Sequence, residues 1–83
     1  RKEVQFHFLP QQCTIRIFTI AGELVRVIEH REGSLGWRGP AVEAWDLRTY
    51  NNQEVAFGIY IFHVETDSGG ETFSETGKFA IIR

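Results

Sequence analysis

Apolar and polar residues alternate along most of the chain, which is the pattern of half-buried β-strands. Val4, Phe6 and Phe8 are expected on one face of a first strand, which Pro10 ends because proline cannot donate to a strand ladder. The clearest pattern spans 58–65, where apolar residues on both faces favour a central strand. The sequence lacks the spacing of an amphipathic helix and therefore predicts an all-β protein.

Turn residues separate the predicted strands. Asn51 and Asn52 tolerate positive φ and are expected to form a turn, and Asp67–Gly70 is expected to close a hairpin. The glycine-rich stretch 31–40 is expected to be an irregular loop. Further strands are predicted at 13–17, 24–28, 42–45 and 77–82. About seven short strands in 83 residues predict a single domain, 1–83, with an immunoglobulin-like antiparallel β-sandwich fold.

Large apolar residues beside turn signals define the predicted core. Trp45, Tyr60, Phe62 and Ile17 are expected to share one core, with Trp45 at its centre. Gly58 stands between the loop 51–57 and the strongest strand. Its backbone is therefore expected to need glycine, either at positive φ or where a neighbouring segment leaves no space for a Cβ atom.

Length and charge argue against several classes of protein. The net charge is −2 with both signs interspersed, which argues against nucleic-acid binding. No apolar stretch reaches the ~20 residues of a membrane-spanning helix. The chain begins at Arg1 without methionine or the hydrophobic region of a signal peptide, so we expect a piece of a longer protein.

The residue types that carry catalysis or bind metals form no familiar motif. His7 and His63 could face each other across strands, but zinc needs further ligands, which favours solvent-facing histidines. Asp46 and Glu54 could form a carboxylate pair, yet an aspartate after a core tryptophan more often accepts backbone N–H groups in a turn. The lone Cys13 is expected to pack as a small apolar group. We therefore expect no enzymatic activity, no catalytic residues, no metal and no cofactor.

Trp37 has a role that the pattern leaves open. It lies in the glycine-rich loop beside Arg38. Either it folds back as a lid over one end of the sandwich, as large aromatic side chains tend to be buried, or it is an exposed anchor for a partner. The arginines at positions 16, 26 and 48 are expected to be solvated charges.

An ordered set of short segments resembles a known family of domains. The segments are Phe6–Pro10, Ile15–Phe18, Ala21–Arg26, Trp45-Asp46, Asn51–Ala56, Gly58–Tyr60 and Gly77–Arg83. Together they are similar to the immunoglobulin-like domain shared by the flagellar hook-capping protein and the C-terminal sorting domains of type IX secretion cargo. That family usually carries glycine after Trp-Asp, where this chain has Leu47, so the resemblance leaves the geometry of this turn open.

The resemblance implies a non-enzymatic C-terminal module of a larger secreted bacterial protein, located at the cell surface. Sorting domains of this kind are recognised by an outer-membrane export machine. The expected partners are therefore proteins: the upstream domains of the parent chain and the secretion or assembly machinery. A terminal strand at Gly77–Arg83 is expected to pair with such a partner, with Lys78 and Arg83 among its contacts. Two alternatives stay open: a structural module of an extracellular filament or appendage, and a carbohydrate-binding module that stacks sugars on Trp37 and Tyr50.

Overall fold

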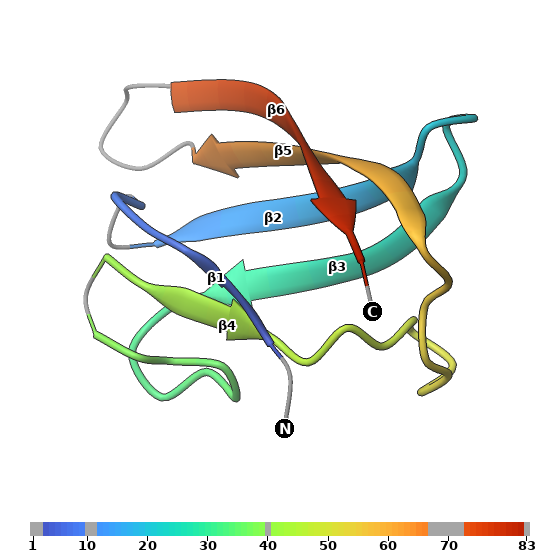
Figure 1. The fold of residues 1–83 in the computed structure, drawn as a ribbon. Coiled ribbons are helices and arrows are strands. Elements are labelled where there is room, and N and C mark those ends of the chain that lie inside the picture. Colours follow the sequence, from blue (N-terminus) through green and yellow to red (C-terminus); the bar gives the residue numbers. More distant parts are fainter. Residues whose placement is uncertain (1–2, 10–11, 40, 67–72, 83) are drawn as a thin grey trace.

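A computed structural model describes residues 3–9, 12–39, 41–66 and 73–82. It confirms the predicted fold class, because antiparallel strands form two sheets in a β-sandwich-like arrangement (Figure 1). The strands are β1 (Val4–Phe6), β2 (Cys13–Thr19), β3 (Leu24–His30), β4 (Glu43–Trp45), β5 (Gly58–Thr66) and β6 (Phe73–Ile81). The described part of the chain thus has six strands, where the sequence predicted about seven. It contains no helix of a length and hydrophobicity that could cross a membrane.

The two sheets differ in size. The larger has the strand order β3-β2-β5-β6, and the smaller pairs β1 with β4. In the larger sheet Ile15 lies opposite Val64 and Ile17 opposite Phe62, so the apolar residues of β2 and β5 share one face. β1 and β4 lie across this face (Figure 1). The core therefore lies between a four-stranded and a two-stranded layer.

Trp45 lies deep in the core, with only 1% of its surface exposed. Its ring meets Tyr60 and Phe79 edge to face, at centroid distances of 6.5 and 6.1 Å. Ile17 is fully buried, and Phe62 is half-buried against the same cluster. The four residues expected to share a core lie in one cluster, which Phe79 extends to β6 at the edge of the larger sheet.

The first strand is shorter than its apolar pattern predicts. Phe6 is buried, but Phe8 has φ +61° and is 94% exposed, so the expectation that Val4, Phe6 and Phe8 share one face is wrong at Phe8. A positive φ breaks the extended backbone, and the alternation of side chains ends with it. The chain then turns so that the Leu9 N–H donates to the carbonyl of Ala41 at 3.0 Å.

Positive φ values also mark the segment that joins β4 to β5. Gly58 has φ +149°, and the nearest atom to a Cβ built there is Cε1 of Tyr60 at 4.0 Å, so the conformation and not a lack of space calls for glycine. Asn52 has φ +63° in the turn that the Thr49 N–H closes by donating to the Gln53 carbonyl. The hairpin expected at Asp67–Gly70 lies outside the described residues, although β5 and β6 pair in antiparallel fashion on either side of it.

Candidate functional site

A buried contact between a histidine and a glutamate links the end of β3 to the start of β4. The Nδ1 atom of His30 lies 2.6 Å from Oε1 of Glu43, and both side chains are almost completely buried. Both point inward because of strand alternation: His30 follows Ile28 by two residues, and Glu43 precedes Trp45 by two. Burying a carboxylate is unfavourable without partners, so this one must be held by hydrogen bonds.

Glu43 receives those hydrogen bonds from the glycine-rich loop. The hydroxyl of Ser34 donates to Oε1 at 2.8 Å, and the Gly36 N–H donates to Oε2 at 3.1 Å. The loop backbone also bonds β4 directly, because the Ala44 N–H donates to the Gly36 carbonyl at 2.7 Å. A Cβ atom at Gly36 would collide with the carbonyl oxygen of Ala44 and lie 2.6 Å from Oε2 of Glu43. Glycine at position 36 is therefore required by the approach of β4, and the carboxylate of Glu43 holds the loop in place.

Trp37 is positioned by the same network. Its ring stacks on His30, with a centroid distance of 5.1 Å and an interplanar angle of 17°, and it is half-buried. Its backbone forms an isolated bridge with Glu43. The sequence left two roles open for Trp37, a lid that folds back over the sandwich and an exposed anchor for a partner. In the structure its ring folds back over His30, and the imidazole covers one face of the ring.

A second polar cluster fixes the turn after Trp45. The Arg48 N–H donates to Oδ1 of Asp46 at 3.1 Å, as expected for an aspartate at this position. The Arg26 guanidinium donates to the same oxygen at 3.2 Å and to the Arg48 carbonyl at 2.9 Å. The expectation that Arg26 is a solvated charge is therefore wrong. Its side chain reaches from β3 to the turn because Trp45 also donates to that carbonyl, at 3.0 Å, and brings the turn close to the sheet.

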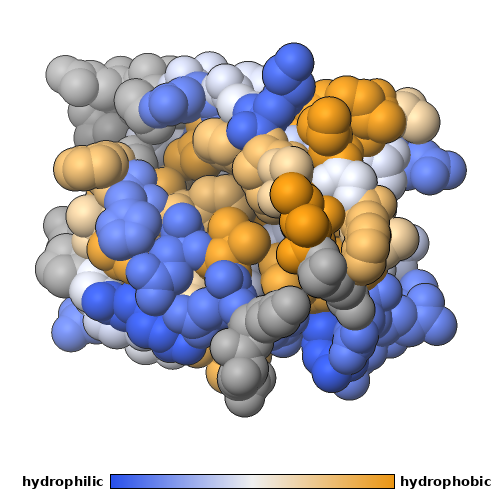
Figure 2. All heavy atoms as spheres, viewed as in Figure 1, coloured by the Kyte–Doolittle hydropathy of each residue, from blue (hydrophilic) through white to orange (hydrophobic). Residues whose placement is uncertain are grey.

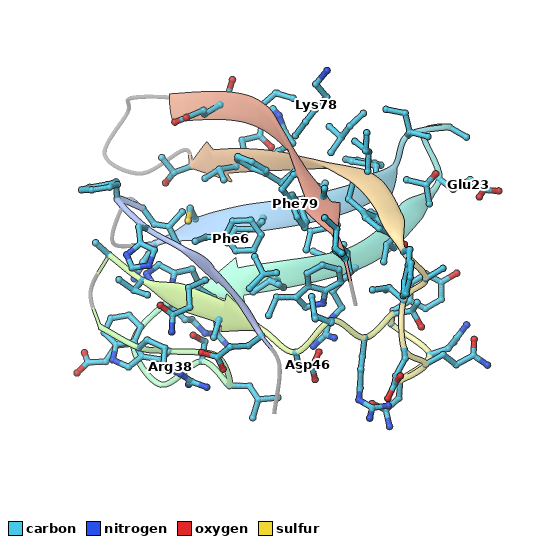
Figure 3. All side chains as sticks on the ribbon, in the orientation of Figure 1. Phe6, Glu23, Arg38, Asp46, Lys78 and Phe79 are labelled. Carbon is cyan, nitrogen blue, oxygen red and sulfur yellow. The ribbon has the colours of Figure 1, made fainter. Side chains whose placement is uncertain are left out.

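The residues considered as partner contacts do not form one surface. Arg38 is exposed and pairs with Glu3, Nη2 to Oε1, at 3.1 Å. Lys78 lies on β6 at the other side of the molecule, as Figure 3 shows, and is also exposed. Arg83 lies outside the described residues. Trp37 and Arg38 are neighbours in the loop before β4, so the structure separates that pair from Lys78.

The histidines considered as metal ligands have other neighbours. His7 lies 3.2 Å from the Gln5 side chain, and Nδ1 of His63 lies 2.9 Å from the Thr76 hydroxyl. In the part of the chain that the structure describes, no three His, Cys, Asp or Glu side chains gather where they could hold a metal ion.

Cys13 is buried at the start of β2, opposite His30 in the sheet register. Burial, together with the smaller effect of the nearby charge of Glu43, raises the pKa of its thiol to about 11. The sulfur is therefore a protonated thiol at neutral pH, which makes it a poor nucleophile.

Comparison with known proteins gives one informative similarity in fold. No protein-family model and no curated protein sequence matches this chain. Among solved structures it resembles PorZ, an essential bacterial surface component of the type-IX secretion system of Porphyromonas gingivalis from the human oral microbiome. The match has a TM-score of 0.60 and 24% sequence identity, and it covers 86% of this chain but 8% of PorZ. The chain thus has the fold of one small region of a much longer protein.

Proposed function

We propose that this domain is a non-enzymatic β-sandwich module of a larger secreted bacterial protein, and that it docks its parent to type IX secretion machinery at the cell surface. The observation that carries the proposal is the similarity of 86% of the chain to a small region of PorZ, itself a surface component of that system. Since one fold serves many functions, the similarity supports the proposal and an export experiment must test it.

The polar side chains that could carry chemistry make contacts within the fold, which supports a module that acts by binding. The carboxylates of Glu43 and Asp46 bond to loop and turn groups, and His30 contacts Glu43 and Trp37. These contacts stabilise the fold. The carbohydrate-binding alternative has less support, because His30 covers one face of the Trp37 ring on which a sugar would stack.

The test is a reporter that carries a signal peptide at its N-terminus and residues 1–83 at its C-terminus. It is produced in a bacterium that has the type IX machine and in a strain that lacks it. We expect the reporter at the cell surface only in the first strain. A reporter that stays in the periplasm while the attached domain is folded contradicts the proposal and favours the structural-module alternative.

Point variants separate recognition from folding better than truncation does. Deleting 77–83 would remove Phe79 and Ile81, which pack in the core. The exposed Lys78 and Ile82 offer a milder change, and Lys78→Glu with Ile82→Ser is expected to lower surface export without shifting the unfolding midpoint. The matched control is Glu23→Lys, a charge change of the same size in the exposed turn between β2 and β3, which is expected to leave export unchanged.

A further inference from the structure

The smaller sheet covers only part of the inner face of the larger one. In the described part of the chain β1 pairs with β4 alone, and β6 pairs with β5 alone, so each sheet ends in an edge strand. Between β1 and the inner face of β5 and β6 lies a groove of about 360 Å³. Hydrophobic side chains are exposed on this face of the molecule (Figure 2). An edge strand beside an uncovered apolar face is the geometry that accepts an added strand.

The groove has an aromatic floor. Phe62 and Phe79 line it, and Phe6 of β1 meets their rings edge to face at 5.4 and 6.0 Å. Gly77 makes this floor possible, since a Cβ there would lie 2.5 Å from Cζ of Phe62. The Phe62 ring can therefore lie against the backbone of β6. Both Phe62 and Phe79 are only half-buried, which leaves apolar ring surface for a further side chain.

Phe8, at the rim of the groove, is a second observation that favours a ligand there. Its side chain is 94% exposed, so it adds little to the core, while its φ of +61° is unfavourable for any residue with a Cβ. Stability alone would favour glycine or asparagine here. An exposed aromatic ring held in a strained conformation beside an apolar groove suits an anchor for a partner.

Charge selects the chemistry of the occupant. Glu75 lines the groove from β6, and its exposed side chain has no hydrogen bond or ion pair to another described residue. No lysine or arginine lines the groove with it. A basic side chain on the occupant would therefore meet an uncompensated carboxylate.

We propose that this groove binds an extended strand of another polypeptide, which pairs with the open edge of β1. Its alternate apolar side chains lie on Phe62 and Phe79, and a lysine or arginine at one end meets Glu75. The open edge is that of β1, Val4–Phe6, which at about 3.3 Å per residue offers ~10 Å for backbone pairing, and the rest of the occupant lies along Phe8 and Leu9, which continue the groove. This inference does not rest on the proposed role in secretion, and its test uses only the purified chain and peptides.

The probe is an array of seven-residue peptides based on acetyl-Lys-Val-Thr-Val-Thr-Val-Thr-amide, with the lysine at either end and Ile, Leu or Phe in place of valine. Binding is followed by backbone amide shifts and hydrogen exchange of the uniformly labelled chain. We expect shifts at Val4–Leu9, Phe62 and Phe79, and slower exchange within β1, Val4–Phe6. Peptides with a central proline are expected not to bind, since proline interrupts the ladder.

Three variants define the site. Phe8→Asn is expected to weaken binding about fivefold or more while leaving the unfolding midpoint unchanged or higher. Glu75→Gln is expected to reduce by about two- to fivefold the preference for a peptide with a terminal lysine over an added control peptide that has glutamate in place of that lysine. Ile59→Ser removes exposed apolar surface from β5 outside the groove and is expected to leave affinity unchanged.

Several outcomes would overturn the inference. If no peptide of the array shifts the Val4–Leu9 amides at millimolar concentration, the groove is not a strand acceptor. Shifts confined to the outer edge of β6 would move the site to that edge. Concentration-dependent shifts at Val4–Leu9 without peptide, together with a dimer in sedimentation, would assign the groove to a second copy of this chain and remove the foreign partner.

Discussion

Leu47 is a single residue in which backbone and side chain have opposite preferences. Its φ is +64°, a left-handed conformation that costs a residue with a Cβ about 1–2 kcal/mol. Its side chain is nevertheless buried in the core cluster. The family that the sequence resembles usually has glycine at this place, and a glycine would take this φ without strain. Here the buried leucine side chain offsets the strain of the turn.

This opposition gives an unusual order of stabilities. Leu47→Ala is expected to destabilise the domain by about 2–5 kcal/mol, because the side chain leaves a cavity while the strain remains. Leu47→Gly loses the same packing but relieves the strain, so it is expected to be as stable as Leu47→Ala or about 1 kcal/mol more stable. Urea unfolding of both variants measures the difference. A glycine variant clearly less stable than the alanine variant, as at an ordinary position, would contradict the argument.

The thiol of Cys13 makes the stability of the domain depend on pH. Its pKa rises from 9.0 to about 11 on folding, so between these values the folded protein keeps a proton that the unfolded chain loses. The stabilisation is fully present below pH 9 and is lost as the pH rises toward 11, by on the order of 2 kcal/mol. Comparing wild type with Cys13→Ala in urea at pH 8 to 11 isolates the thiol, because the other groups titrate in both proteins. A stability difference that does not narrow over this range would contradict the shift.

At the scale of the element, the loop between β3 and β4 depends on one carboxylate. Glu43 bonds to Ser34, Gly36 and His30, so a single side chain connects a strand, a loop and the neighbouring sheet. The loop backbone also bonds to β4 through the Ala44 N–H and the Gly36 carbonyl, and the carboxylate of Glu43 adds the side-chain bonds that keep it there. The loop is therefore expected to lose its structure when this carboxylate is removed.

Glu43→Ala is expected to destabilise the domain by about 3–5 kcal/mol, because it leaves a buried histidine and loop donors without their acceptor. Hydrogen exchange at Gly36 and Ala44 is expected to accelerate. Glu29→Ala is the matched control, since Glu29 is the exposed neighbour of His30 and its loss is expected to change stability by no more than about 0.5 kcal/mol. Similar effects of the two substitutions would remove Glu43 from its anchoring role.

At the scale of the whole molecule, one aromatic cluster joins the two sheets. Trp45 comes from the smaller sheet, and Tyr60 and Phe79 come from the larger one. The sheets share this core, so they are expected to unfold together in a single transition.

Trp45→Ala is expected to cost about 3–5 kcal/mol of unfolding free energy, because Trp45 fills the space between the sheets. Tyr50→Ala, at an exposed aromatic position, serves as the control and is expected to change stability by less than about 0.5 kcal/mol. Chemical unfolding followed by circular dichroism and by fluorescence checks both expectations. A cost below about 1 kcal/mol for Trp45→Ala would show that the sheets do not depend on this residue.

The sequence alone determined the fold class, the positions of most strands and four residues of the core cluster. Strand alternation is a local property, so β2 and β5 are visible in the pattern, and Ile17, Tyr60 and Trp45 can be assigned to the interior. The same alternation held a signal for the buried pair: His30 stands two residues after Ile28, and Glu43 two before Trp45. Apolar residues on both faces of the strand, at 24–28, and the ordinary preference of histidine for the surface obscured that signal.

Only the tertiary structure decided which distant groups meet. His30 and Glu43 are thirteen positions apart in the sequence, and Arg26 and Asp46 are twenty apart, separations that no local pattern encodes. The end of β1 at Phe6 also escaped the pattern, because the apolar alternation continues to Phe8 while the backbone adopts a positive φ. The groove beside β1 exists because two strands cover a sheet of four. Strand pairing and the uneven size of the two layers are properties of the assembled chain, and they set the surfaces through which this domain can bind.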